Sequence, residues 1–107
     1  MIYHKNLLVI KIIFENISKK IIFGVYRPSA YMKETGNFFT TVRMDILKKE
    51  IAPDDDVVMN VILESPAGFG EYLKEGALLS IRNGLEEEGR AIVLQILEYM
   101  DEVQTKK

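Results

Sequence analysis

The amino-acid sequence predicts an all-β fold, a small six-stranded antiparallel Greek-key barrel, on three observations. Six strand-like runs fit within about 95 residues, a density typical of a β-barrel or sandwich. Turn-forming residues separate the runs, and no segment shows the periodicity of a long amphipathic helix. The chain has 107 residues, of which 48% are hydrophobic, so we expect a single domain with one core over residues 7–98 and a frayed tail over 99–107.

The first half of the chain predicts three strands. Residues 7–15 (LLVIKIIFE) and 21–26 (IIFGVY) are rich in Ile and Val, and the polar stretch NISKK between them predicts a hairpin. In residues 37–47 (NFFTTVRMDIL), alternate residues share one face: Phe38, Thr40, Val42 and Met44. Pro28 lies between these runs, in VYRPSAYMK. Because proline cannot donate to a sheet ladder, we expect Pro28 at an edge or a bend.

The second half predicts three more strands, over residues 57–65 (VVMNVILES), 77–84 (ALLSIRNG) and 90–99 (RAIVLQILEY). Each alternates with a two-residue period, as in a sheet with one wetter side. The residues that share a face are Val57, Met59, Val61 and Leu63 in the first of these strands, and Ala77, Leu79 and Ile81, opposite Leu78, Ser80 and Arg82, in the second. The stretch FGEYLKEGA, around Gly76, predicts no more than one helical turn.

Composition and charge exclude several classes of protein. The chain contains no cysteine, which excludes a disulfide framework and a thiol nucleophile and favours a cytoplasmic protein. Lys11 and Glu15 interrupt the apolar N-terminal run, so we expect neither a signal peptide nor a membrane span. The net charge of −2 hides an asymmetry: residues 1–53 hold nine basic and four acidic side chains, a net of +5, and the remainder holds five and twelve, a net of −7. A dedicated nucleic-acid binder is usually more basic.

Several turn motifs resemble the third, C-terminal domain of elongation factor Tu and its relatives. VYRPSAYMK is similar to the Tyr-Arg-Pro-rich start of that domain, and PDDDVVM (residues 53–59) is similar to the Pro-Gly-Asp-Asn turn that begins its next strand. NVILESP resembles its apolar strand ending in proline, and EGALLSIRNGLEEEGRAIVLQIL resembles its Ile-Arg-Glu-Gly-Gly turn and final strand. The order holds from Leu7 to Leu97. The resemblance implies the same barrel, with Pro28 at a bend where a long strand begins.

The resemblance also implies candidate binding residues. Arg82, Asn83 and Gly84 match the corner that touches the tRNA backbone in the family, and a guanidinium beside a glycine amide suits a phosphate contact. Lys33 lies where the family carries a basic residue, and Arg27 precedes the proline. The alternatives are a solvated Asn-Gly hairpin turn at residues 82–84 and a structural Arg27 whose stem packs across the barrel rim.

The remaining polar clusters do not favour a catalytic or metal site. Asp54–Asp56 lack the glycine and the distal glutamate of an EF-hand, so we expect a solvated turn there. Glu86–Glu88 are expected to form a charged hairpin tip, because consecutive residues point in different directions and nothing pairs them as acid and base. His4 is the only histidine, and neither a metal triad nor a Ser-His-Asp arrangement can be assembled from it.

The function expected from the sequence is therefore binding without catalysis. The chain has no GxxxxGK[ST] phosphate loop, so GTP hydrolysis is excluded, and we expect no nucleotide, metal or other cofactor. We expect a binding module of the translation-factor barrel type that engages a protein, tRNA or other RNA partner, not a membrane, as a monomer or weak homodimer. One alternative is a cytoplasmic immunity or decoy protein that neutralises a toxin or competes with elongation factor Tu. An enzyme of unknown type is the minor alternative.

Overall fold

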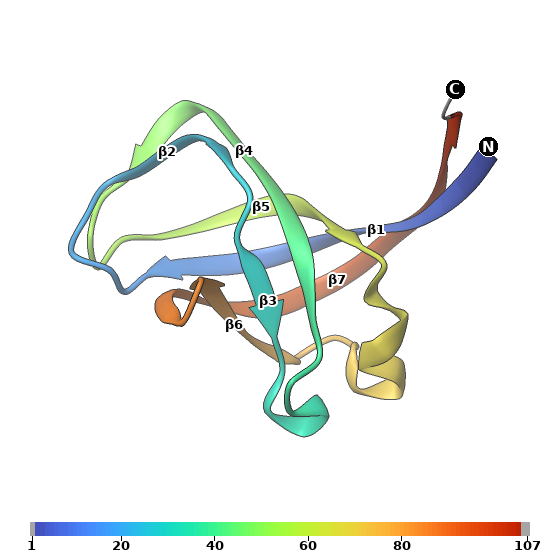
Figure 1. The fold of residues 1–107 in the computed structure, drawn as a ribbon. Coiled ribbons are helices and arrows are strands. Elements are labelled where there is room, and N and C mark those ends of the chain that lie inside the picture. The colour runs from blue at the N-terminus through green and yellow to red at the C-terminus, as the bar shows by residue number, and fades with distance from the viewer. Residues whose placement is uncertain (1, 106–107) are drawn as a thin grey trace.

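The computed structural model describes the backbone of residues 2–105 and the side chains of residues 6–46 and 50–99. This part of the chain folds into strands joined by turns and two short 3-10 helices (Figure 1). The strands are β1 (Ile2–Asn16), β2 (Ile22–Tyr26), β3 (Ser29–Tyr31), β4 (Phe39–Ile51), β5 (Asp56–Glu64), β6 (Leu78–Asn83) and β7 (Glu86–Thr105). The 3-10 helices are η1 (Lys33–Thr35) and η2 (Pro66–Tyr72), so the helical turn begins earlier than the sequence suggests.

The strands form a closed antiparallel barrel, which confirms the predicted fold class. Their order is β2-β4-β3-β6-β7-β1-β5, and a further pairing between β4 and β5 closes the sheet. Some neighbouring strands are distant in the sequence, such as β1 and β5, and β3 and β6. The long connections that bring such strands together are typical of a Greek-key arrangement. Closure matters for stability because it removes most of the unpaired strand edges that an open sheet exposes.

Pro28 interrupts one long strand and so separates β2 from β3. Tyr26 pairs with Met44 of β4, and Ser29 pairs with Thr41, so β2 from Gly24 onward and β3 follow β4 in one register. The carbonyl of Pro28 still accepts a hydrogen bond from the Val42 N–H at 2.9 Å. Since proline has no N–H, the reciprocal bond is missing and the strand breaks there. Pro28 directly precedes the first residue of β3, and β2 and β3 together count as the one strand that a six-stranded barrel requires.

The predicted hairpin between the first two strands is wrong. Both edges of β1 are occupied, by β5 on one side and β7 on the other, and β2 pairs with β4 instead. Asn16 redirects the chain at this point, because its buried amide donates to the carbonyls of Lys20 at 2.8 Å and Ile51 at 2.9 Å. Its Oδ1 accepts from the N–H of Ser18 at 2.9 Å. These hydrogen bonds connect the NISKK turn to Ile51 of β4 at the end of the barrel.

The C-terminal strand is also longer than expected. We predicted a frayed tail over residues 99–107, but β7 continues to Thr105 and pairs with the start of β1, from Tyr99 opposite Leu8 to Thr105 opposite Ile2. The two strands leave the barrel together, so Ile2 and Thr105 lie at the same side of the molecule (Figure 1). The physical reason is that β1 begins at Ile2 rather than near Leu7 and offers a partner to the tail. The side chain of His4 lies outside the described residues.

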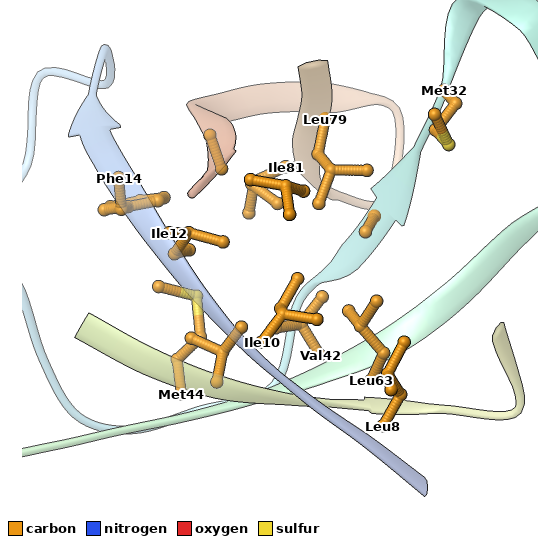
Figure 2. Packing of buried hydrophobic residues seen from close by; sticks show 14 of the residues in the cluster. Leu8, Ile10, Ile12, Phe14, Met32, Val42, Met44, Leu63, Leu79 and Ile81 are labelled. Atoms are coloured by element: carbon orange, nitrogen blue, oxygen red, sulfur yellow. The ribbon is translucent and has the colours of Figure 1, made fainter. Parts of the chain in front are cut away.

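The core contains the alternating residues that the sequence predicts. The inner faces of β1, β4, β5 and β6 meet in the centre of the barrel (Figure 2). Buried side chains include Leu8, Ile10, Ile12, Phe14, Val42, Met44, Val61, Leu63, Leu79 and Ile81. Phe69 of η2 is fully buried and meets Phe38 edge to face, with 4.9 Å between the ring centroids. Burial of this set is the main stabilising contribution to the fold.

Candidate binding groove

A groove of about 660 Å³ lies on the outer face of the barrel, between η1 and strands β1, β3, β6 and β7. Part of its lining is an apolar row that the sheet register creates. Leu78 pairs with Ile92, and Ile92 pairs with Ile13. Ile13 in turn pairs with Val58 of β5, so the row continues past the groove across a fourth strand. Leu78 is 66% exposed and Val58 is 56% exposed, an unusual exposure for apolar side chains in such an ordered row.

A chain of polar contacts lines the groove beside the apolar row. The guanidinium of Arg82 stacks on the ring of Tyr31, with its central carbon 4.5 Å from the ring centroid. The Nε–H of Arg82 donates to Ser80 Oγ at 3.0 Å, and the Ser80 hydroxyl donates to Glu87 Oε2 at 2.5 Å. The other oxygen of Glu87 lies 3.6 Å from Arg90 Nε. Tyr31, Ser80 and Arg90 occupy neighbouring register positions, which explains how three strands build one chain of contacts.

The ionisable side chains of the groove balance in sign. Three cationic residues line it, namely Lys33, Arg82 and Arg90, and three acidic residues line it, namely Glu15, Asp56 and Glu87. Glu87 is shared by contacts that lead to both arginines. The groove is therefore neutral overall by formal charge. A neutral groove with an apolar row favours an uncharged or mixed surface as its ligand over a polyanion.

The structure separates the binding residues that the sequence predicts. Arg82 and Lys33 line the same groove. Asn83 pairs with Glu86, and Gly84 adopts a φ of 66° in the tight turn between β6 and β7, where a residue with a Cβ would be strained. Arg27 lies elsewhere: its Nη1 bonds to Asp45 Oδ1 of β4 at 2.9 Å. The predicted set thus contributes two residues to the groove, two to a hairpin turn and one to an ion pair with β4.

Sequence reasoning missed the other side chains of the groove. Tyr31, Glu87 and Arg90 were not singled out as site residues, and neither were Leu78 and Ile92. The alternation of ALLSIRNG did place Leu78, Ser80 and Arg82 on one face, which is the face that the groove uses. The missing information was that β3 lies beside β6, which brings Tyr31 to the same surface.

Glu88 does not belong to a charged tip, so the prediction for Glu86–Glu88 is wrong at this residue. Its side chain is only 1% exposed. The hydroxyl of Tyr26 donates to Glu88 Oε1 at 2.6 Å, and the ammonium of Lys20 forms an ion pair with Oε2. The network joins β7, β2 and the turn before β2, at the end of the barrel that Asn16 also organises.

The contacts of Glu88 shift three pKa values. Burial opposes ionisation of Glu88, but its contacts with Lys20 and Tyr26 outweigh burial and lower the pKa of the carboxyl. Burial, followed by the hydrogen bond to Glu88, raises the pKa of Tyr26. The hydrogen bond and the negative charge of Glu88 raise the pKa of Lys20. At neutral pH these shifts favour a carboxylate on Glu88, a neutral phenol on Tyr26 and an ammonium on Lys20. The three groups therefore stabilise the contact of β7 with β2 and with the turn before β2.

Comparison with protein-family models and with curated proteins identifies no relative. No protein-family model matches the chain, and no curated protein matches it. Among the described side chains, no group of three or more His, Cys, Asp or Glu residues is arranged to hold a metal ion. The described residues contain no helix that is long and apolar enough to cross a membrane. The outer groove combines an exposed apolar row with an ordered chain of polar contacts, as binding surfaces do.

Proposed function

We propose that the chain is a binding module without catalytic activity, of the translation-factor barrel type, that engages a protein partner through the groove. The observation that carries this proposal is the exposed apolar row of Leu78, Ile92 and Ile13 beside a charge-balanced set of polar side chains. The module has no GTPase activity of its own. The absence of cysteine supports a place in the cytoplasm.

A protein surface fits the groove better than RNA does. Covering a half-exposed leucine or isoleucine contributes roughly 1 kcal/mol for each side chain. Tyr31 and Arg82 add a preorganised aromatic and guanidinium pair, and residues of these two types dominate the energetics of protein interfaces. RNA binding draws its affinity from the release of counterions by unpaired basic residues. The acidic side chains of the groove, Glu87 above all, oppose that contribution.

The two other functions that the sequence predicts, tRNA binding and neutralisation of a toxin, each need a surface with a net charge, unlike the neutral groove. A tRNA-binding corner of the elongation-factor type needs a basic face at Arg82–Gly84, but Glu86 and Glu87 are the register partners of Asn83 and Arg82. A decoy for a basic nuclease needs a surplus of acidic side chains. In the groove, basic and acidic side chains are equal in number. Both readings therefore become outcomes of the test below.

Affinity capture from cell lysate, with and without RNase, tests the proposal. The bait is the full chain, compared with a Leu78→Lys/Ile92→Lys variant and with Leu85→Lys as the matched control. Leu85 is an apolar residue at the β6–β7 turn that is 99% exposed and lies outside the groove lining. We expect an RNase-resistant protein that the control retains and the groove variant loses at least tenfold. A partner that is lost on RNase treatment, or one that the groove variant still retains, contradicts the proposal.

A further inference from the structure

We propose that the partner of the groove is an extended protein segment with an acidic side chain at one end, a basic side chain at the other and apolar side chains between them. The inference rests on the proposed function, because it names the chemistry of the segment that the groove binds. It is carried by the placement of the ionisable side chains of the groove, whose formal charges cancel overall but are separated in space.

The charges at the two ends of the groove differ in sign. The contacts between the two arginines and Glu87 occupy its middle. Lys33 lies at the η1 end, and Glu15 and Asp56 lie at the end that β1 and β5 form. All three end residues are exposed, and none of them forms an ion pair with another described side chain. A ligand with an acidic group beside Lys33 and a basic group beside the two carboxylates complements this arrangement.

The acidic end of the groove holds two carboxylates close together. Glu15 and Asp56 are direct register partners on neighbouring strands. Like charges directly opposite each other in an antiparallel pair are destabilising. Arg90 is the register partner of Glu15 on the other side, but its Nε lies 3.6 Å from Glu87 and is shared with that carboxylate. A lysine or arginine of the partner, placed over Glu15 and Asp56, therefore relieves a repulsion that the free chain retains.

The apolar row connects the two charged ends. Leu78, Ile92 and Ile13 lie side by side on β6, β7 and β1. Val58 continues the row on β5, the strand that begins with Asp56. Residues that share a face of one strand are roughly 6.6 Å apart, so the row is narrower than an α-helix, whose diameter is about 10–12 Å. An extended segment fits the row, because its alternate side chains reach the surface and the others point away.

The dimensions of the groove set the spacing of the charges in the partner. From β3, which leads into η1, to β5, the row crosses four interstrand spacings, roughly 19 Å at about 4.8 Å each. An extended chain rises about 3.3 Å per residue, so six steps cover roughly 20 Å. The partner segment therefore carries its acidic and basic residues about six positions apart, with apolar residues at alternate positions between them.

Titration of two synthetic peptides with blocked ends into the isotopically labelled full chain, followed by NMR, tests the inference. The charged peptide is Glu-Ser-Leu-Ser-Leu-Ser-Lys, which presents Glu, both Leu and Lys on one face when extended. The neutral peptide has Gln at both ends. At about 20 mM salt, where screening is weak, we expect the charged peptide to bind at least fivefold more tightly. Equal affinities, or no binding of either peptide up to about 5 mM, overturn the inference.

Charge reversal in the chain tests which end of the groove binds which charge. Lys33→Glu is expected to reverse the preference, so that Lys-Ser-Leu-Ser-Leu-Ser-Lys binds more tightly than the peptide that begins with Glu. The matched control is Lys19→Glu, since Lys19 is an exposed lysine outside the groove lining, and it leaves the preference unchanged. Circular dichroism verifies that each variant folds. A preference that Lys33→Glu does not alter contradicts the placement of the acidic residue.

The lysate capture described above separates failure of this inference from failure of the proposed function. If the charged and neutral peptides bind equally while capture still requires Leu78 and Ile92, the inference is wrong and the proposed function stands. If capture of a protein partner does not require Leu78 and Ile92, the proposed function is wrong, and the inference that rests on it is overturned as well.

Discussion

Substitution of Gly89 by alanine tests the packing that links β7 to the core. Gly89 pairs with Asn16 of β1 and with Ile81 of β6. A Cβ at this position would lie 2.3 Å from Cε2 and 2.5 Å from Cζ of Phe14, and 3.0 Å from the backbone oxygen of Glu15. Carbon atoms in favourable contact are about 3.5–4.0 Å apart, so the ring has to move by roughly 1 Å.

The expected cost follows from the surroundings of Phe14. Its ring is fully buried in the barrel, among the side chains shown in Figure 2, and has no solvent into which it can swing. Overpacking of a filled core costs about 1–3 kcal/mol. We expect Gly89→Ala to lower the free energy of unfolding by that amount. In a chain of this size, each kcal/mol corresponds to a decrease in Tm of about 4 °C or more. Urea denaturation, monitored by circular dichroism, measures the free energy of unfolding, and thermal unfolding with the same signal measures the Tm.

A double-mutant cycle shows whether the ring is the cause. Phe14→Leu removes the outer ring atoms that the new methyl group meets, at its own cost from the cavity that it leaves. In the Phe14→Leu background, Gly89→Ala is expected to cost at least about 1 kcal/mol less than in the wild type. An equal cost in both backgrounds, or a cost below about 0.5 kcal/mol in the wild type, would refute the close approach of β7 to Phe14.

Three further predictions concern the barrel end and the groove. Glu88 has a pKa in the folded state below its ordinary value of 4.5. Its contribution to stability is therefore present above pH 4.5 and is lost as the pH falls through the folded-state pKa. Urea titrations at a series of pH values are expected to show that the free energy of unfolding decreases less on acidification in Glu88→Gln than in the wild type. Asn16→Ala leaves the carbonyls of Lys20 and Ile51 without their donor and is expected to lower the free energy of unfolding by about 1–3 kcal/mol. Arg82→Glu removes the stacking on Tyr31 and places a second carboxylate opposite Glu87, so we expect partner binding to decrease. Calorimetry is expected to show that the free energy of unfolding falls by only about 1 kcal/mol. A decrease above about 3 kcal/mol would show that Arg82 has a mainly structural role.

Local pattern predicts which residues of a strand face the core, but not which strands become neighbours. The alternation of Val57, Met59, Val61 and Leu63 predicts their common face, and the most deeply buried two, Val61 and Leu63, belong to the core. The hairpin expected between residues 7–15 and 21–26 was wrong, because β5 and β7 compete for the same edges of β1. That competition depends on residues more than 40 positions away, which a short window does not contain.

The candidate site was predictable to a similar degree. Arg82 and Lys33 meet at the groove because β6 and η1 are both adjacent to β3. Arg27 does not join them, since it lies before the break at Pro28 and its side chain pairs with Asp45 of β4. Glu88 was missed for a different reason. A glutamate in a run of three reads as solvated, and only the approach of Tyr26 and Lys20 across the barrel end explains its burial.

The break at Pro28 separates two stretches of one long strand that have different neighbours. Before the break, β2 follows β4 but extends beyond the reach of β6, because the pairing of β3 with β6 ends at Ser29 opposite Arg82. Continuing that register places Arg27 opposite Gly84, where the chain turns back, so no strand within residues 2–105 pairs with this edge of β2. After the break, β3 has β6 beside it and carries Tyr31 into the groove. One strand, longer than its neighbour, thus leaves an open edge at one end and helps to build a lined groove at the other.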